Sequence, residues 1–275
     1  MHVPGIPVLI YHAIDTVDHS AFPMNVSVSV SKFKQQMEWL HNEGYNSVSK
    51  QDLHDVVLNG KKLTGKYVHI TFDDGYLSLY KYALEILSQY GFVATLFLST
   101  AYIGKSYSLK EFDFVKHDRQ LTWEEIKALV ANGWSIQSHS NKHARLKYMD
   151  TATLGTELML SKTIIEQNLG TVVDEIAYPY GLYSNEVIIQ AKAAGYKFAY
   201  SVHSGKIFPK AARYRLPRID ISNTDSMELF AAKVTTGHTS PAEARRARIR
   251  DIIYANAAVK DFIEKWTLHL GIGNR

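Results

Sequence analysis

Carboxylate and imidazole side chains gather at three points along the chain, each directly after a short apolar run. Asp73 and Asp74 follow YVHITF, and His12 follows VLIY. His139 directly follows WSIQS, and His143 lies four residues further on. One aspartate and two histidines are ligands that zinc accepts, and a second carboxylate or a further histidine can transfer a proton near neutral pH. These residue types therefore indicate metal-assisted acid–base chemistry.

Each motif taken alone also has a plainer interpretation. The Asp-Asp-Gly sequence at 73–75 is often only a turn, in which Gly75 permits a sharp exit from the strand. A lone His-x-x-x-His pair is more often part of a solvated loop, although residues four apart on a helical turn share one face and can reach one ion. His12 is equally a buried rim histidine or a general acid.

The elements that must position these residues alternate between strands and helices. Apolar spacing and capping signals predict helices at residues 31–43, 77–90, 122–133, 151–169, 185–194 and 227–234. Short apolar runs predict strands at 7–12, 67–72, 92–98, 134–138, 175–178, 198–202 and 216–221. This alternation indicates an α/β fold with a parallel sheet, and the number of units favours a closed or nearly closed barrel. The carboxyl ends of barrel strands form one face, so the three motifs should converge there.

The composition excludes several classes of protein. A chain of 275 residues with 46% hydrophobic and 21% charged residues suits one large domain, or at most two small ones. The absence of cysteine excludes disulfide scaffolds, thiolate metal sites and cysteine nucleophiles. A net charge of +4 is too mild for a nucleic-acid binder, and no Gly-rich phosphate loop follows an early strand. No apolar run approaches the ~18 residues of a membrane span, and residues 1–10 do not resemble a signal peptide.

The last part of the chain differs in character from the rest. Apolar residues recur at near-helical spacing over 241–270, and the segment begins with a cluster of arginines at positions 245, 246, 248 and 250. We therefore divide the chain into a barrel domain, 1–236, and a C-terminal helical extension, 237–275, packed on it with the arginines in solvent. The alternative is peripheral contact of this basic helix with a polyanion or a membrane surface.

Together the motifs resemble those of the polysaccharide deacetylases, the NodB-homology group that forms carbohydrate esterase family 4. TFDDG at Thr71–Gly75 matches the first motif of the family and HSNKH at His139–His143 matches the second. AYPYG at Ala177–Gly181 matches the third, in which the family usually has Arg at the first position. The resemblance extends over roughly residues 7–234. It implies a metal-dependent N- or O-deacetylase on a distorted (β/α)7-type barrel.

Two departures from the family pattern point to one subgroup. Ala177 stands where an arginine usually orients the catalytic base, and the C-terminal Leu-x-His motif that usually supplies the acid is not evident, since His238 matches it poorly. Tyr11-His12 on the first strand, together with AYPYG, instead resembles the biofilm poly-β-1,6-N-acetylglucosamine N-deacetylases. This resemblance moves the acid to His12 and leaves two arginines as candidates to orient the base: Arg218 and Arg215.

The resemblance implies a role for each candidate residue. Asp74, His139 and His143 bind a divalent metal, Zn²⁺ with Co²⁺ or Ni²⁺ as substitutes. Asp73 accepts the proton of the attacking water, and His12 protonates the leaving amine. Three tyrosines are expected at the substrate, the last of them also through its backbone N–H: Tyr76, Tyr178 and Tyr180.

The expected partner is an acetylated polysaccharide, first of all poly-β-1,6-N-acetylglucosamine. The protein is expected to be a monomer that is extracellular or associated with the cell envelope. Peptidoglycan, chitooligosaccharides and acetyl-xylan stay open as substrates within the enzyme class. A catalytically weak glycan-binding module on the same barrel is the alternative from another class, but the intact set of acid–base and ligand residues favours the enzyme.

Overall fold

A computed structural model describes residues 5–15, 27–105, 119–240, 242, 243 and 245. Six strands pair side by side in parallel, in the order β1 (Ile6–Tyr11), β5 (Lys66–Asp74), β6 (Ala94–Leu98), β7 (Ser135–Ser138), β8 (Glu175–Ala177) and β9 (Phe198–Tyr200).

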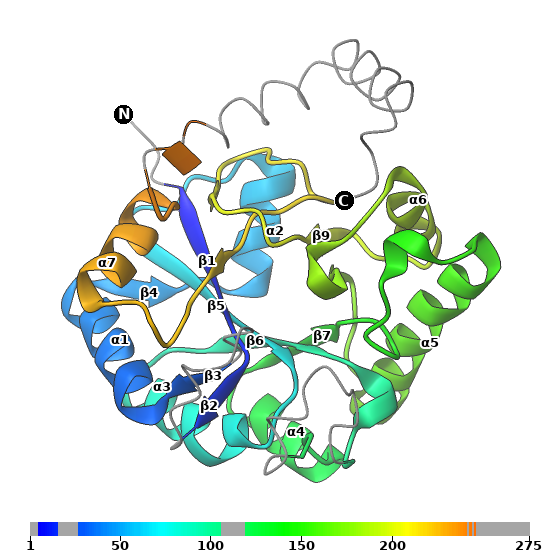
Figure 1. Cartoon of the computed structure of the whole chain (residues 1–275), viewed down its shortest axis with the longest axis horizontal. Coiled ribbons are helices and arrows are strands. Elements are labelled where there is room, and N and C mark those ends of the chain that lie inside the picture. The colour runs from blue at the N-terminus through cyan, green and yellow to red at the C-terminus, as the bar shows by residue number, and fades with distance from the viewer. Residues whose placement is uncertain (1–4, 16–26, 106–118, 241, 244, 246–275) are drawn as a thin grey trace.

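The segment that carries β11 (Ile219–Asp220) closes this sheet. β11 pairs in parallel with β1, and Leu216, just before it, forms a bridge with Tyr200 of β9. The sheet therefore curls round to its own first strand, with helices on the outside (Figure 1). This confirms the expected distorted (β/α)7-type barrel.

Four further short strands lie outside this closed order. β10 (Lys206–Ile207) pairs antiparallel with the start of β1, and β4 (Tyr45–Ser47) pairs with the start of β5. β2 (Ala13–Asp15) and β3 (Ser27–Ser29) form a separate two-stranded sheet directly after His12. These four strands were not predicted from the sequence.

Most helices begin where the capping signals predict. These are α1 (Val30–Asn42), α4 (Trp123–Ala131), α5 (Thr151–Leu169), α6 (Asn185–Ala193) and α7 (Met227–Thr236). Each has a Ser, Thr or Asp before its first residue whose side chain accepts a backbone N–H of the first turn. The helix predicted at 77–90 is instead a π-helical turn, η1 (Leu79–Ala83), that continues into α3 (Leu84–Gln89).

One helix, α2 (Lys50–Asn59), was not predicted. Its apolar residues Leu53, Val56 and Val57 join a cluster with Val8 of β1 and Phe198 of β9, so the helix covers the end of the barrel where the strands begin. The opposite end, where the strands finish, is the end that carries the candidate chemistry.

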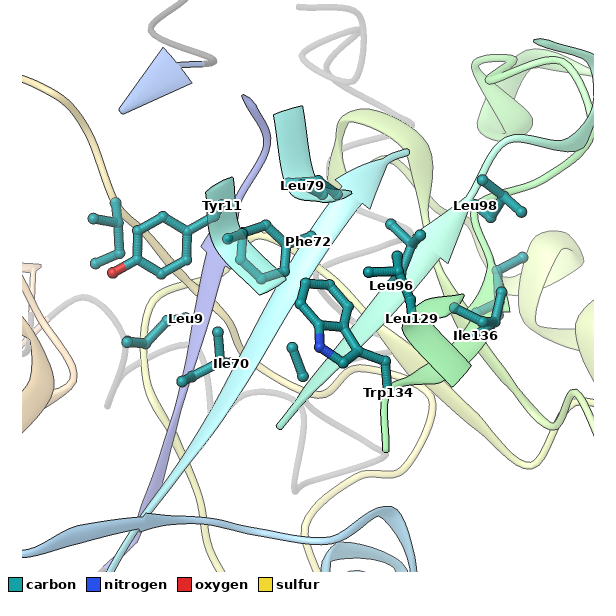
Figure 2. Close-up of a cluster of buried hydrophobic side chains, with 14 of the residues drawn as sticks. Leu9, Tyr11, Ile70, Phe72, Leu79, Leu96, Leu98, Leu129, Trp134 and Ile136 are labelled. Atoms are coloured by element: carbon teal, nitrogen blue, oxygen red, sulfur yellow. The ribbon is translucent and has the colours of Figure 1, made fainter. Parts of the chain in front are cut away.

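The main core lies between the barrel and the outer helices. Figure 2 shows it around Tyr11, Phe72, Leu96 and Trp134, where Phe72 stacks on Trp134 with ring centroids 5.1 Å apart. Since neighbouring residues of a strand face opposite sides, the outward Phe72 leaves Asp73 directed at the barrel interior.

The C-terminal extension expected at 237–275 lies almost wholly outside the described residues, so its boundary stays a prediction. None of the described helices combines the length and the hydropathy that crossing a bilayer requires.

Candidate active site

Asp73 and Asp74 are the last two residues of β5, and both are almost fully buried, at 3% and 2% exposed. Asp74 has a left-handed backbone (φ +72°), and Gly75 after it has φ +94°. Few residues other than glycine adopt this conformation without strain. A Cβ on Gly75 would also come within 2.6 Å of a side-chain carbon of Leu98. The turn thus lets two adjacent carboxylates serve the same site.

The two histidines lie in the loop after β7 and not on a shared helical turn. Ser140 and His143 both have left-handed backbones, with φ +62° and +53°, and the loop forms no helix between them. Their imidazoles nevertheless come together, with ring centroids 4.9 Å apart. Left-handed residues in a loop, rather than helical periodicity, bring the pair to one point.

A backbone carbonyl fixes the orientation of His139. Its Nδ1 lies 2.8 Å from the carbonyl oxygen of Ala177, which suits donation by Nδ1–H and leaves Nε2 with a lone pair. That Nε2 lies 3.8 Å from Oδ1 of Asp74, and Nε2 of His143 lies 3.5 Å from the same oxygen. Four ligands in a tetrahedron around zinc are separated by about 3.4 Å, so these distances suit one ion.

The donor set itself fits a divalent metal ion. Asp74, His139 and His143 offer ligand atoms that all lie within 4.8 Å of one another, the one such group among the described residues. Oδ1 of Asp74 is buried with no hydrogen-bond partner among them, and burial raises the pKa of this carboxyl against the opposing effect of His139 and His12. A cation would relieve that cost.

The protonation of the histidines also suits metal binding. Burial lowers the pKa of His139 to about 4, although Asp73 opposes the shift. The pKa of His143 is likewise lowered to about 4 by burial. Both imidazoles are therefore neutral at pH 7, the state that a metal ligand requires.

Replacing His139 with Ala is expected to remove one of the three ligands. Metal affinity should fall by about 100-fold or more, since even a change in a partner of a ligand costs 10–100-fold. Metal content after dialysis, with circular dichroism to verify the fold, measures this. His69→Ala is a matched control, because His69 is also buried but lies in the middle of β5 and is not one of the three candidate ligands. Stoichiometric metal in His139→Ala would contradict the assignment.

Asp73 has a different partner from Asp74. Both of its oxygens accept hydrogen bonds from Arg218, at 2.7 and 2.8 Å, in a bidentate pair. Arg218 is fully buried and its Nε donates to the carbonyl of Ser201 at 3.2 Å. Burial alone would raise the pKa of Asp73, but Arg218, His139 and His12 hold it well below its usual range. The carboxylate is therefore ionised at neutral pH.

Of the two candidate arginines, the structure thus places Arg218 against Asp73. The guanidinium of Arg215 lies instead over the ring of Tyr183, at 5.9 Å. The ion pair of Arg218 with Asp73 joins residues 145 positions apart in the chain, and Arg218 belongs to the segment that closes the barrel.

His12 lies on the same face of the barrel. The register pairs Tyr11 with Phe72, so His12 is level with Asp73 on the neighbouring strand. It is partly exposed, and its charge lowers the pKa of both Asp73 and Asp74. A group at this place can reach a substrate and the two carboxylates together.

Two other histidines were considered from the sequence, and one of them, His203, follows β9 and accepts the backbone N–H of Arg218 through its carbonyl. Nδ1 of His203 is 2.8 Å from Oγ of Ser201, and its ring lies beside Tyr183. His238 follows Gly237, which packs near Lys206, and Lys206 pairs with Pro7 at the start of β1. His238 therefore belongs to the end of the barrel opposite His12.

The three tyrosines expected at the substrate differ in exposure. Tyr76 and Tyr178 are fully buried, and the hydroxyl of Tyr178 donates to the carbonyl of Tyr214 at 3.3 Å. Neither ring face is open to a sugar, so we correct the expectation for these two. Tyr180 is partly exposed, and its ring centroid lies 4.6 Å from that of His143.

Sequence reasoning missed Arg145. Its guanidinium carbon lies 4.5 Å from the centroid of the Tyr180 ring, a cation–π contact at the edge of the metal-ligand group. The signal in the sequence was slight, since Arg145 is merely two residues after His143 in a loop.

A family model described as polysaccharide deacetylase matches residues 60–199, just over half of the chain. The chain belongs to the polysaccharide deacetylase family. The matched range contains both aspartates, both histidines and the AYPYG sequence. The protein is accordingly a hydrolase that acts on N-acetyl groups of polysaccharides, in a family of metal-dependent enzymes.

Two relatives are similar over most of the chain. The Bacillus subtilis (strain 168) protein YxkH, named as a polysaccharide deacetylase, is 30% identical over 229 residues, which are 83% of this chain and 76% of that protein. The poly-beta-1,6-N-acetyl-D-glucosamine N-deacetylase of Staphylococcus aureus (strain N315) is 28% identical over 208 residues, which are 72% of this chain and 69% of that protein.

Solved structures agree with the fold. The deacetylase PplD of Streptococcus pyogenes, in complex with acetate, superposes with a TM-score of 0.73 at 26% identity, over 85% of this chain and 99% of that one. IcaB from Ammonifex degensii gives a TM-score of 0.71 at 20% identity, over 85% of this chain and 97% of that one. The latter likeness concerns the fold alone.

Proposed function

We propose that this deacetylase hydrolyses the N-acetyl groups of an N-acetylglucosamine polysaccharide, poly-β-1,6-N-acetylglucosamine before others, outside the cell or at its envelope. The observation that carries the proposal is that the adjacent aspartates have different partners: Asp73 is held by Arg218, while Asp74 faces His139 and His143. The similarity to the staphylococcal N-deacetylase supports the choice of substrate, and His12 on the first strand supports it further.

In this proposal Asp73 is the general base. Arg218 keeps the carboxylate ionised and fixes both of its oxygens, and His139 lies within 3.7 Å of one of them. A water molecule that attacks the acetyl carbonyl carbon gives its proton to Asp73. The C–N bond then breaks, the nitrogen takes a proton from His12, and the products are acetate and a free amine.

Asp74, His139 and His143 would hold the divalent ion, which we propose to be zinc. Bound there, such an ion polarises the acetyl carbonyl and makes water a better nucleophile at neutral pH. Tyr180 is placed to help in two ways. Its left-handed backbone (φ 57°) lies in the η5 turn (Pro179–Gly181) beside His143, where its N–H can stabilise the oxyanion, and its ring can contact a sugar.

Acetate release from a panel of glycans tests the substrate. The panel comprises poly-β-1,6-N-acetylglucosamine, peptidoglycan, chitooligosaccharides and acetyl-xylan, each assayed with zinc and then with a chelator. We expect chelator-sensitive release, fastest from the β-1,6-linked polymer. Faster release from another glycan would replace the substrate, and binding without release from any of them would favour a glycan-binding module.

His12→Ala is expected to lower turnover on the acetamide by about 10²–10⁴-fold, because general acid catalysis contributes about that much. Metal content should stay normal. The loss should shrink on an activated ester, whose leaving group needs little protonation. His203→Ala and His238→Ala are the controls and should be mild on both substrates. A loss confined to the acetamide in His203→Ala would assign the acid to that residue.

A further inference from the structure

The segment that carries both candidate histidines, residues 139–143, has a backbone conformation that is unfavourable for an isolated chain. We call this segment the ligand loop. Ser140 and His143 have positive φ angles of +62° and +53°, in a region that residues with a Cβ rarely occupy. Such conformations persist only where the surrounding structure enforces them. The contacts that enforce this one therefore bear on where the two imidazoles lie.

One set of contacts comes from the end of β6 and the short helix η2 (Thr100–Tyr102) that follows it. The backbone N–H of Thr100 donates to the carbonyl of Ser140 at 3.4 Å, and the N–H of Ala101 donates to the carbonyl of Asn141 at 2.9 Å. The hydroxyl of Thr100 also donates to the side-chain oxygen of Asn141 at 2.9 Å. These hydrogen bonds fix two successive carbonyl groups of the ligand loop.

Helix α5 holds the N–H groups of the same loop. Glu157, in the second turn of α5, accepts the backbone N–H of Lys142, the residue immediately before the second histidine. One turn further on, Oγ of Ser161 lies 2.8 Å from Oγ of Ser138, which accepts the backbone N–H of Ser140 at 3.2 Å. The ligand loop is thus held on both sides by other elements of the fold.

Glu157 is the unexpected member of this set. It is 6% exposed and lies on the buried face of α5 with Leu154 and Leu158, a place where a glutamate is rare unless it is paired. An apolar residue would satisfy the packing of this face, so the N–H group of Lys142 accounts for the carboxyl group there. Loss of the carboxyl group would leave that N–H without its acceptor.

We propose that Glu157 is a positioning residue for the metal ion. Through the N–H of Lys142 it fixes the ligand loop so that Nε2 of both histidines faces Asp74 before an ion binds. The affinity for the metal then depends on Glu157 separately from the stability of the fold. This inference rests on the proposed metal ligands and not on the identity of the glycan.

The test compares the wild type with three variants at this position. Glu157→Leu and Glu157→Ala remove the acceptor, with and without replacing its volume, while Glu157→Gln keeps an oxygen that can accept the same N–H. Zinc affinity is measured by competition with a chromophoric chelator, the geometry of the site by the absorption spectrum of bound Co²⁺, and stability by urea unfolding in the presence of a chelator.

Glu166→Leu is the matched control. Glu166 also belongs to α5 and accepts a backbone N–H, that of Val173, at 3.0 Å, but it lies toward the other end of the helix. The same chemical change is therefore made on the same helix, away from the ligand loop.

We expect Glu157→Leu and Glu157→Ala to bind zinc about 10–100-fold more weakly than the wild type, as is usual for a lost partner of a metal-ligand group, and to change the Co²⁺ spectrum. Glu157→Gln should retain an affinity close to that of the wild type. Glu166→Leu should lower the free energy of unfolding and leave the zinc affinity and the spectrum unchanged.

Three results would overturn the inference. These are an unchanged zinc affinity in the folded Glu157→Leu or Glu157→Ala protein, an equal loss of affinity in Glu166→Leu, and a wild type that binds no zinc, which would overturn the ligand assignment as well. Zinc binding in the expected order without acetate release from any glycan would contradict the proposed function and support the inference.

Discussion

Asp73→Asn is expected to keep its metal and to lose about 10²–10⁴-fold in turnover, the usual contribution of a general base. An amide has nearly the size of the carboxylate but cannot accept the proton of the attacking water. The proposed metal-ligand atoms belong to Asp74, His139 and His143, so the change leaves them intact. Acetate release and metal content, measured on the same preparation, separate the two effects.

Asp74→Asn is the matched partner of this experiment, because it makes the same chemical change at the adjacent position. It should weaken metal binding, since the unpartnered Oδ1 of Asp74 lies within 4 Å of both imidazoles. Activity should then recover in part when the metal concentration is raised, which Asp73→Asn should not show. Equal loss of metal in the two variants would mean that the roles of base and ligand are misassigned.

The location of these residues could be predicted because it follows from local pattern and parallel topology. Asp73 and His139 directly follow apolar runs, and parallel strands bring their carboxyl ends to one face. The Thr122–Glu125 capping box likewise predicted the start of α4, and both reciprocal hydrogen bonds of the box are present in the structure. In each case the information lies within a dozen residues of sequence.

The partner of Asp73 could not be chosen on this basis. Arg218 and Arg215 both precede the last strand, and a strand of two residues gives no register from which to tell inside from outside. The choice depends on how the segment from Leu216 to Asp220 bridges β9 and β1. That is a contact between distant parts of the chain.

The prediction that two of the tyrosines contact the substrate does not agree with their burial. Tyr76 and Tyr178 adjoin catalytic motifs in the sequence, yet the structure turns both into the interior. An aromatic ring beside a motif can serve the core or the ligand, and composition does not separate the two. Helix α2 was not predicted for a related reason. Its apolar residues pack against the end of the barrel where the strands begin, a contact that depends on the tertiary fold.

Arg218→Met is expected to destabilise the protein by about 3–5 kcal/mol at pH 7, because it leaves the buried carboxylate of Asp73 without its cation. Arg218 is fully buried, so solvent cannot replace the guanidinium. Urea unfolding at several pH values measures the change. The double variant Asp73→Asn/Arg218→Met should cost less than the sum of the two single changes, since each single change strands the other partner.

The pH dependence of this loss has a definite sign. In the wild type the pKa of Asp73 is lowered on folding, so the ion pair contributes stability above the unfolded pKa of about 3.9 and loses it as the pH falls. In Arg218→Met the burial that raises this pKa is no longer opposed by the arginine. The two proteins should therefore differ most in stability near pH 7 and converge in acid, where Asp73 is protonated in both.

The change in the pKa of Asp73 should also appear in the pH dependence of catalysis. A base works only when it is deprotonated, so the acid limb of kcat/KM should move to higher pH in Arg218→Met, because the pKa of Asp73 rises. Arg218→Lys keeps the charge but not the bidentate fork, and its acid limb should lie between the other two. An unshifted acid limb in a folded Arg218→Met protein would show that Arg218 supports the barrel but does not tune the base.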